Sequence, residues 1–114
     1  MLHLDIEVPR NADYIEHWQL LDRDGEPIDL TTDTLTASAR NVAGGASVIA
    51  SATITKDAGA DGLFTMLWRG SDFDGFGGKM QVVRAAYDLK QTFSDGLSRI
   101  VCRGHLIIHP EVTI

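Results

Sequence analysis

Apolar and polar side chains alternate at a period of two in several stretches of this chain, which is the pattern of half-buried β-strands. No stretch long enough for a stable helix keeps its apolar positions at helical spacing. Seven stretches carry the strand pattern: 2–8, 14–21, 35–40, 48–55, 63–68, 79–93 and 97–108. This spacing predicts a two-sheet antiparallel immunoglobulin-like β-sandwich, with a small β-barrel as the alternative.

The alternation also predicts which side chains face the core. We expect the even-numbered residues of 2–8, 48–54 and 64–68 to point inward, together with Trp18 and Leu20. In the last two strands, the expected inward residues are Val83, Ala85, Tyr87, Leu89, Ile100, Cys102, Leu106 and Ile108. Turns should fall at the Asp-Gly pairs, because Asp bonds the backbone that follows it and Gly accepts a positive φ. These pairs are Asp24-Gly25, Asp61-Gly62, Asp74-Gly75 and Asp95-Gly96.

A chain of 114 residues predicts one domain, residues 1–114, with enough buried surface to fold without disulfides or metal. The lone Cys102 lies within an apolar alternating stretch, so we expect it to pack in the core as a small hydrophobic residue. The apolar runs are far shorter than a membrane span, and the N-terminus alternates instead of forming a signal-peptide core. Neither a membrane partner nor a cofactor is expected.

The formal charge of −6 is unevenly distributed. Residues 1–33 carry nine carboxylates and two basic side chains, whereas the remaining residues carry seven acids and eight bases. An acidic lobe repels phosphate backbones, so nucleic acid is not an expected partner. The acidic lobe is either a solvated face or a surface that meets the less charged part of a neighbouring copy.

The least regular stretch, residues 69–78, contains four glycines and is expected to be an exposed loop. Its charged and aromatic residues form the candidate partner-binding loop: Arg69, Asp72, Phe73, Asp74 and Phe76. Exposed Phe73 and Phe76 rings would stack on a sugar or dock into a partner subunit. The Asp72-Phe73-Asp74-Gly75 run lacks the further acidic ligands of a calcium loop, so turn formation is the preferred interpretation.

The sequence does not predict a catalytic site. It lacks a nucleophile elbow, a phosphate-binding loop, a His-Glu-x-x-His motif and a Cys-x-x-Cys motif. His105 and His109 share a strand face but should lie about 13 Å apart, too far to hold one metal ion within a chain. Copies around a symmetry axis would still bring equivalent histidines together, so metal binding there stays open.

Two passages carry a resemblance to small β-sandwich proteins of tailed bacteriophages and prophages. The first is residues 18–31, WQLLDRDGEPIDLT, with a hydrophobic strand, an Asp-x-Asp-Gly turn and Pro-Ile-Asp-Leu-Thr. The second is the hairpin at 87–113, YDLKQTFSDGLSRIVCRGHLIIHPEVT, which contains Gly104 and ends in Pro110-Glu111-Val112-Thr113. Related modules occur in baseplate, tail, neck and head-decoration proteins.

This resemblance implies a non-enzymatic virion structural or assembly protein, made in the bacterial cytoplasm and incorporated into the virion. Its expected partners are other virion proteins and copies of itself, in a homo-oligomer. The chain ends one residue after Val112-Thr113, which favours a connector, adaptor or decoration subunit over a receptor-binding protein. A carbohydrate-binding or host-surface-binding module is the alternative.

Overall fold

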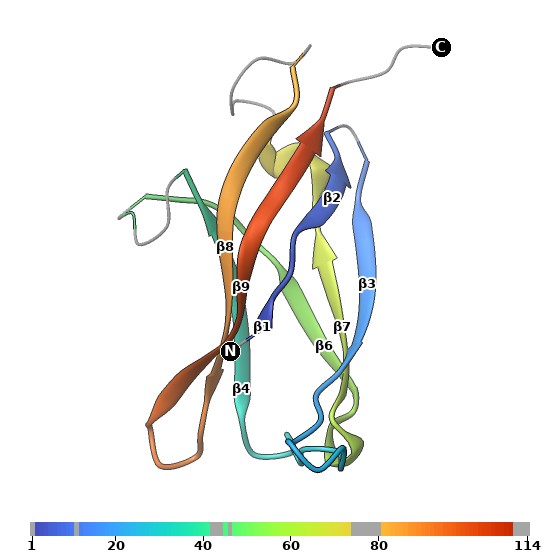
Figure 1. The fold of residues 1–114 in the computed structure, drawn as a ribbon, viewed down its shortest axis with the longest axis vertical. Coiled ribbons are helices and arrows are strands. Elements are labelled where there is room, and N and C mark those ends of the chain that lie inside the picture. Colours follow the sequence, from blue (N-terminus) through green and yellow to red (C-terminus); the bar gives the residue numbers. More distant parts are fainter. Residues whose placement is uncertain (1, 11, 42–44, 46, 74–80, 111–114) are drawn as a thin grey trace.

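The computed structural model describes residues 2–10, 12–41, 45, 47–73 and 81–110. Within them the chain is all-β and forms two sheets that pack face to face (Figure 1). The strands are β1 (Leu2–His3), β2 (Ile6–Pro9), β3 (Tyr14–Gln19), β4 (Thr34–Arg40), β5 (Val48–Ser51), β6 (Thr53–Ala58), β7 (Leu63–Trp68), β8 (Val83–Thr92) and β9 (Ser98–His109). Two short 3-10 turns, η1 (Gly59–Asp61) and η2 (Gly70–Phe73), flank β7.

The larger sheet, sheet A, has the order β1-β9-β8-β4-β5, with β2 also paired to β9, and the smaller sheet, sheet B, has the order β3-β7-β6. In an immunoglobulin domain, strands G, F and C form one sheet and strands B, E and D the other. Here β9, β8 and β4 take the places of G, F and C, while β3, β7 and β6 take those of B, E and D. The predicted immunoglobulin-like sandwich is therefore confirmed.

The predicted hairpin near the C-terminal end is also confirmed. β8 and β9 pair antiparallel from Val83 opposite Ile108 to Thr92 opposite Ser98, with one register shift after Leu89. The turn between them places Gly96 at φ 92°, and Gly25 and Gly62 likewise have a positive φ. Three of the four predicted Asp-Gly turns thus behave as expected, while Asp74-Gly75 lies outside the described residues.

The predicted strand at 48–55 is two strands that belong to different sheets. β5 pairs with β4 in sheet A, and β6 pairs with β7 in sheet B. Between them, the Ala52 N–H donates to the carbonyl of Ala37 at 2.9 Å. The chain therefore passes from one sheet to the other here and closes this side of the sandwich. Val48 is exposed instead of inward, because the register shift between Ala39 and Arg40 places it opposite Arg40, on the outer face of sheet A.

The predicted strand at 2–8 is also divided, into β1 and β2, and both run parallel to β9. Parallel pairing of the two ends of the chain is a departure from the expected antiparallel sandwich. Ile6 and Val8 are buried as predicted, but Leu2 and Leu4 are exposed. Leu2 is register partner of the inward Cys102, so it lies on the inner side of sheet A, yet no strand of sheet B covers it.

The core lies between the sheets and contains the predicted inward residues of the central strands, except Ile100. The register shift after Leu89 places Ile100 opposite the exposed Lys90, so it is only half-buried and the prediction of an inward position is wrong. Phe64, Met66, Trp68, Tyr87, Leu89, Leu106 and Ile108 are all at most 2% exposed. Leu35, Ala37 and Ala39 of β4 are buried too, and the small side chains of Ala37 and Ala39 suit close packing of the sheets. Trp18 is half-buried and stacks on Phe64, with ring centroids 6.0 Å apart.

The close approach of the N-terminal segment to β9 depends on Gly104. A Cβ atom at this position would lie 2.0 Å from the Leu4 carbonyl oxygen, and backbone cannot move aside as a flexible side chain does. We expect Gly104→Ala to lower the free energy of unfolding by about 1–3 kcal/mol, the cost typical of overpacking. Urea denaturation measures this, and Arg103→Ala, on the exposed face of the same strand, should change it by less than about 0.5 kcal/mol. Equal effects of the two variants would contradict the prediction.

Candidate interaction surface

The predicted partner-binding loop is only partly as expected. Arg69 and Asp72 are exposed, and the Arg69 guanidinium lies 3.9 Å from a carboxylate oxygen of Asp13. Phe73, however, is fully buried, so the expectation of an exposed ring at this position is wrong. Asp74 and Phe76 lie outside the described residues. A role of this loop in binding therefore stays a prediction.

Phe73 is buried because hydrogen bonds hold η2 against the segment that joins β2 to β3. The buried Arg10 guanidinium donates to the Phe73 carbonyl at 2.7 Å, and the Gly70 N–H donates to the Asp13 carboxylate at 3.1 Å. Gly70 also lies so close to Ala12 that a Cβ atom would be 2.5 Å from the Ala12 carbonyl oxygen. The first part of the loop is thus a packed element, which nothing in the glycine-rich sequence indicated.

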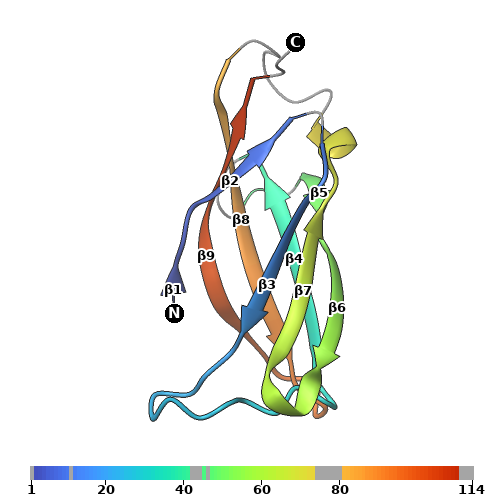
Figure 2. The same cartoon turned by 90° about the vertical axis from the view of Figure 1, so that its right-hand side faces the viewer.

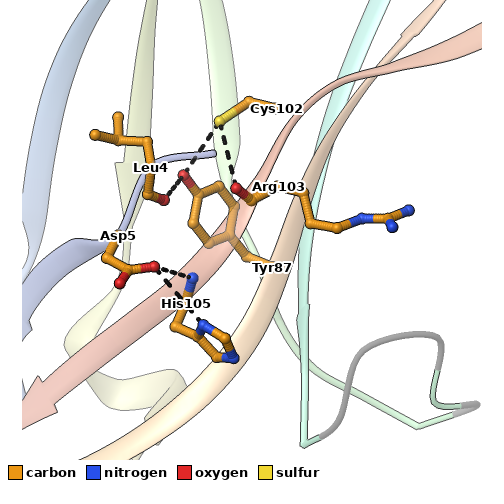
Figure 3. Close-up of polar contacts among 6 residues, drawn as sticks. All are labelled: Leu4, Asp5, Tyr87, Cys102, Arg103 and His105. Carbon is orange, nitrogen blue, oxygen red and sulfur yellow. Dashed lines mark hydrogen bonds and ion pairs between the residues drawn. The ribbon is translucent and has the colours of Figure 1, made fainter. Parts of the chain in front are cut away.

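Polar contacts of Leu4 and Asp5, which lie between β1 and β2, hold the N-terminal segment against β8 and β9 (Figure 3). The Tyr87 hydroxyl donates to the Leu4 carbonyl at 2.6 Å and lies 3.4 Å from the Cys102 Sγ. Burial raises the pKa of the Tyr87 phenol, so this hydroxyl keeps its proton and remains a donor. On the other side, the His105 backbone N–H donates to the Asp5 carboxylate at 3.0 Å.

Two histidines of β9 form pairs with carboxylates of the N-terminal segment. The His105 Nδ1 lies 3.7 Å from Asp5, and the His109 Nε2 lies 3.1 Å from Glu7. All four side chains are exposed, so each pair contributes little to stability by itself. In the part of the chain that the structure describes, no three His, Cys, Asp or Glu side chains gather into a metal-binding group. Each histidine instead pairs with one carboxylate of the N-terminal segment, which runs alongside β9.

An apolar groove lies between β1 and the end of β3. This groove has a volume of about 410 Å³, within the range of ligand-binding pockets. Its lining residues are Leu2, Trp18, Gln19, Leu20, Leu21, Ile28, Arg99, Ile100 and Val101. The Arg99 Nε donates a hydrogen bond to the side-chain oxygen of Gln91 at 3.0 Å. The alternation of the sequence does not indicate this groove, because it forms from segments far apart in the chain.

A second hollow of about 350 Å³ lies on the outer face of sheet A, and its lining is mainly polar. It contains Thr36, Ser38, Arg40, Gly45, Asp88, Lys90 and Ile100. Arg40 and Asp88 form an ion pair across it at 3.6 Å. Its lining thus combines the hydroxyl groups of Thr36 and Ser38 with charged side chains.

Comparison with known proteins adds no relative. A scan against models of protein families gives no match for this chain, and a search of curated proteins gives none either. Among the described residues, no helix is long and apolar enough to cross a membrane.

Cys102 should be chemically inert in the folded protein. It is fully buried, and burial raises the pKa of its thiol, which opposes formation of the reactive thiolate. We expect iodoacetamide at about pH 8 to modify it at least about 100-fold more slowly in the native protein than in the unfolded chain. Ser51→Cys supplies an exposed thiol on β5 as control. Mass spectrometry should show one rapid modification in this variant and none in the wild type, and rapid labelling of the wild type would contradict the burial.

Proposed function

We propose that the protein is a non-enzymatic structural or assembly protein of a tailed-phage virion and acts through protein-protein contacts. The observation that carries this proposal is the resemblance of residues 18–31 and 87–113 to phage β-sandwich modules. In the fold, the first passage covers the end of β3 and the loop after it, and the second covers most of the β8–β9 hairpin. Both passages border the apolar groove, through Leu21 and Ile28 on one side and Arg99 on the other.

Two features of the described surface support a contact function over catalysis. The lining of the groove is mostly apolar, with Gln19 and Arg99 as its polar members, and apolar side chains bury well against another polypeptide. The sheet edge at β3 has no neighbouring strand among the described residues, and a free edge can pair with another chain. An assembly subunit uses such surfaces to hold neighbouring proteins in place.

The alternative of a carbohydrate-binding module loses part of its basis. It required two exposed aromatic rings in the 69–78 loop, and Phe73 supplies its ring to the core instead. The tryptophans do not replace it, because Trp68 is buried and Trp18 stacks on Phe64. We therefore favour the assembly role, with other virion proteins and further copies of the chain as partners.

The proposal predicts that the protein is a component of purified phage particles. Mass spectrometry of particles from the phage or prophage that encodes it should detect the chain in several copies per particle. Deletion of its gene should give particles that lack a part visible by electron microscopy, and expression of the wild-type chain should restore that part. Complete and infectious particles without the protein would overturn the proposal.

A further inference from the structure

We infer that Asp24-Gly25 is a site of spontaneous isoaspartate formation in the folded protein, whereas the fold protects Asp61-Gly62 and Asp95-Gly96. At the modified site, the peptide bond to glycine moves from the α-carboxyl group of the aspartate to its side-chain carboxyl group. The reaction involves only the chain and solvent water. It needs no partner protein, so it is independent of the assembly function proposed above.

Isomerisation at an Asp-Gly pair has two steps. In the first, the glycine nitrogen attacks the side-chain carbon Cγ of the neutral carboxyl group; a C–N bond forms, and the C–OH bond breaks as water leaves with the amide proton. In the second, water adds to the resulting five-membered imide. Opening at the α-carbonyl gives isoaspartate, and opening at the other carbonyl restores aspartate. Glycine favours the reaction because it has no Cβ atom to hinder the close approach.

In a folded chain, the first step requires a free aspartate side chain and a backbone that can rotate around the glycine. One restraint is common to the three pairs, because each glycine N–H donates to the carbonyl three residues earlier. These bonds are Gly25 to Asp22 at 3.0 Å, Gly62 to Gly59 at 3.1 Å and Gly96 to Phe93 at 2.9 Å. Differences between the pairs therefore arise from the carboxylates and from the surrounding packing.

The turns at residues 22–26 and 93–97 have the same pattern of backbone hydrogen bonds. In each turn, the N–H of the first residue donates to the carbonyl of the fifth, at 2.8 Å in the first turn and 2.7 Å in the second. Gly25 and Gly96 hold equivalent places, with φ values of 81° and 92°. A Cβ atom at either glycine would have nothing within 4 Å. Any difference in reactivity between the two turns is therefore a matter of their side chains.

The two aspartates differ in what their carboxylates contact. The Leu97 N–H donates to the Asp95 carboxylate at 3.0 Å, and this bond must break before Cγ can turn toward the glycine nitrogen. In the other turn, the equivalent N–H, that of Glu26, donates instead to the Asp22 carboxylate at 3.0 Å. Asp22 thus takes the donor that would otherwise hold Asp24. Among the described residues, the Asp24 carboxylate receives no hydrogen bond.

Asp61-Gly62 is protected by packing of its backbone. The Asp61 carbonyl accepts from the Gln19 side chain at 3.1 Å, and the Gly62 carbonyl accepts from the Leu20 N–H at 3.0 Å. A Cβ atom at Gly62 would lie 2.6 Å from the Leu20 carbonyl oxygen. Rotation toward an imide therefore requires local unfolding where η1 meets the end of β3.

Asp24-Gly25 has neither form of protection. Both residues are exposed, and they belong to the loop that joins β3 to β4, which projects beyond the two sheets (Figure 2). Exposed loops of this kind open at a small cost in free energy. The backbone at Asp24-Gly25 can therefore reach the imide geometry while the core stays folded.

Isoaspartate at this position would alter the rim of the apolar groove. It inserts the side-chain CH₂ group into the main chain and leaves the α-carboxylate as a side group, so neither the mass nor the net charge changes. Leu21 and Pro27 pair across the base of this turn, and Leu21 and Ile28 line the groove. A longer main chain in the turn would disturb this pairing, so the shape of the groove would change as the protein ages.

The test compares the folded protein with the same chain unfolded in guanidinium chloride, both incubated at neutral pH in H₂¹⁸O. Each passage through the imide incorporates one ¹⁸O atom, which peptide mapping by mass spectrometry assigns to a site. We expect labelling of Asp24 in the folded protein within about threefold of the unfolded rate, and labelling of Asp61 and Asp95 at least about tenfold slower. An isoaspartyl-specific methyltransferase should transfer methyl groups to the aged Asp24 peptide. Protection of Asp24 as strong as that of Asp95 would overturn the inference.

Variants of Asp22 provide a matched pair. Asp22→Asn and Asp22→Ala both remove the charge, but only asparagine keeps an oxygen that accepts from the Glu26 N–H. Labelling of Asp24 should stay at the wild-type rate in Asp22→Asn and fall at least about threefold in Asp22→Ala, because Asp24 then takes the freed N–H. Asp24→Glu, which would need a six-membered ring, should abolish labelling at this site. A rate in Asp22→Ala equal to or above that in Asp22→Asn would overturn the role assigned to the Asp22 carboxylate.

Discussion

The structure depends on the docking of the N-terminal segment along β9. The Leu4 backbone lies against Gly104 of β9, where the absence of a Cβ atom lets the two backbones approach closely. The Tyr87 hydroxyl of β8 donates a hydrogen bond to the Leu4 carbonyl. This contact places Ile6 and Val8 in the core. It also commits the segment to sheet A, so no strand of the described part of the chain lies beside the free edge of β3 in sheet B. One steric constraint thus determines both the completion of the core and the free edge.

The opposite side of the sandwich is closed by the chain itself. The β5–β6 segment leaves sheet A at Ala52 and enters sheet B, so the two sheets are covalently continuous there. The lower end is closed by a buried polar network, in which Gln91 donates to the Asp33 carboxylate at 2.6 Å and accepts from Arg99. The molecule is therefore asymmetric, with one closed side and one open side, and the open side carries both the groove and the edge of β3.

This asymmetry bears on the proposed assembly function. Aliphatic side chains that remain exposed at Leu2 and Leu21 lower the free energy of association when a partner covers them. Backbone groups at the edge of β3 supply directional hydrogen bonds that fix the register of that partner. The groove and the edge of β3 lie on one side of the molecule, whereas the loop at 69–78 contributes a packed Phe73 to the core.

Alternation at a period of two was sufficient to predict the strands of the core, the terminal hairpin and the burial of Cys102, because each depends on side chains within one strand. Local turn chemistry likewise predicted Gly25, Gly62 and Gly96. The sequence did not indicate that the strands at 2–8 and 48–55 would divide, that Phe73 would be buried, or that the N-terminal strand would run parallel to β9. These features depend on contacts between residues far apart in the chain, such as Arg10 with Phe73 and Leu4 with Gly104. A strand pattern specifies which face of a strand is apolar, but only tertiary packing decides which neighbour covers that face and which edge is left without one.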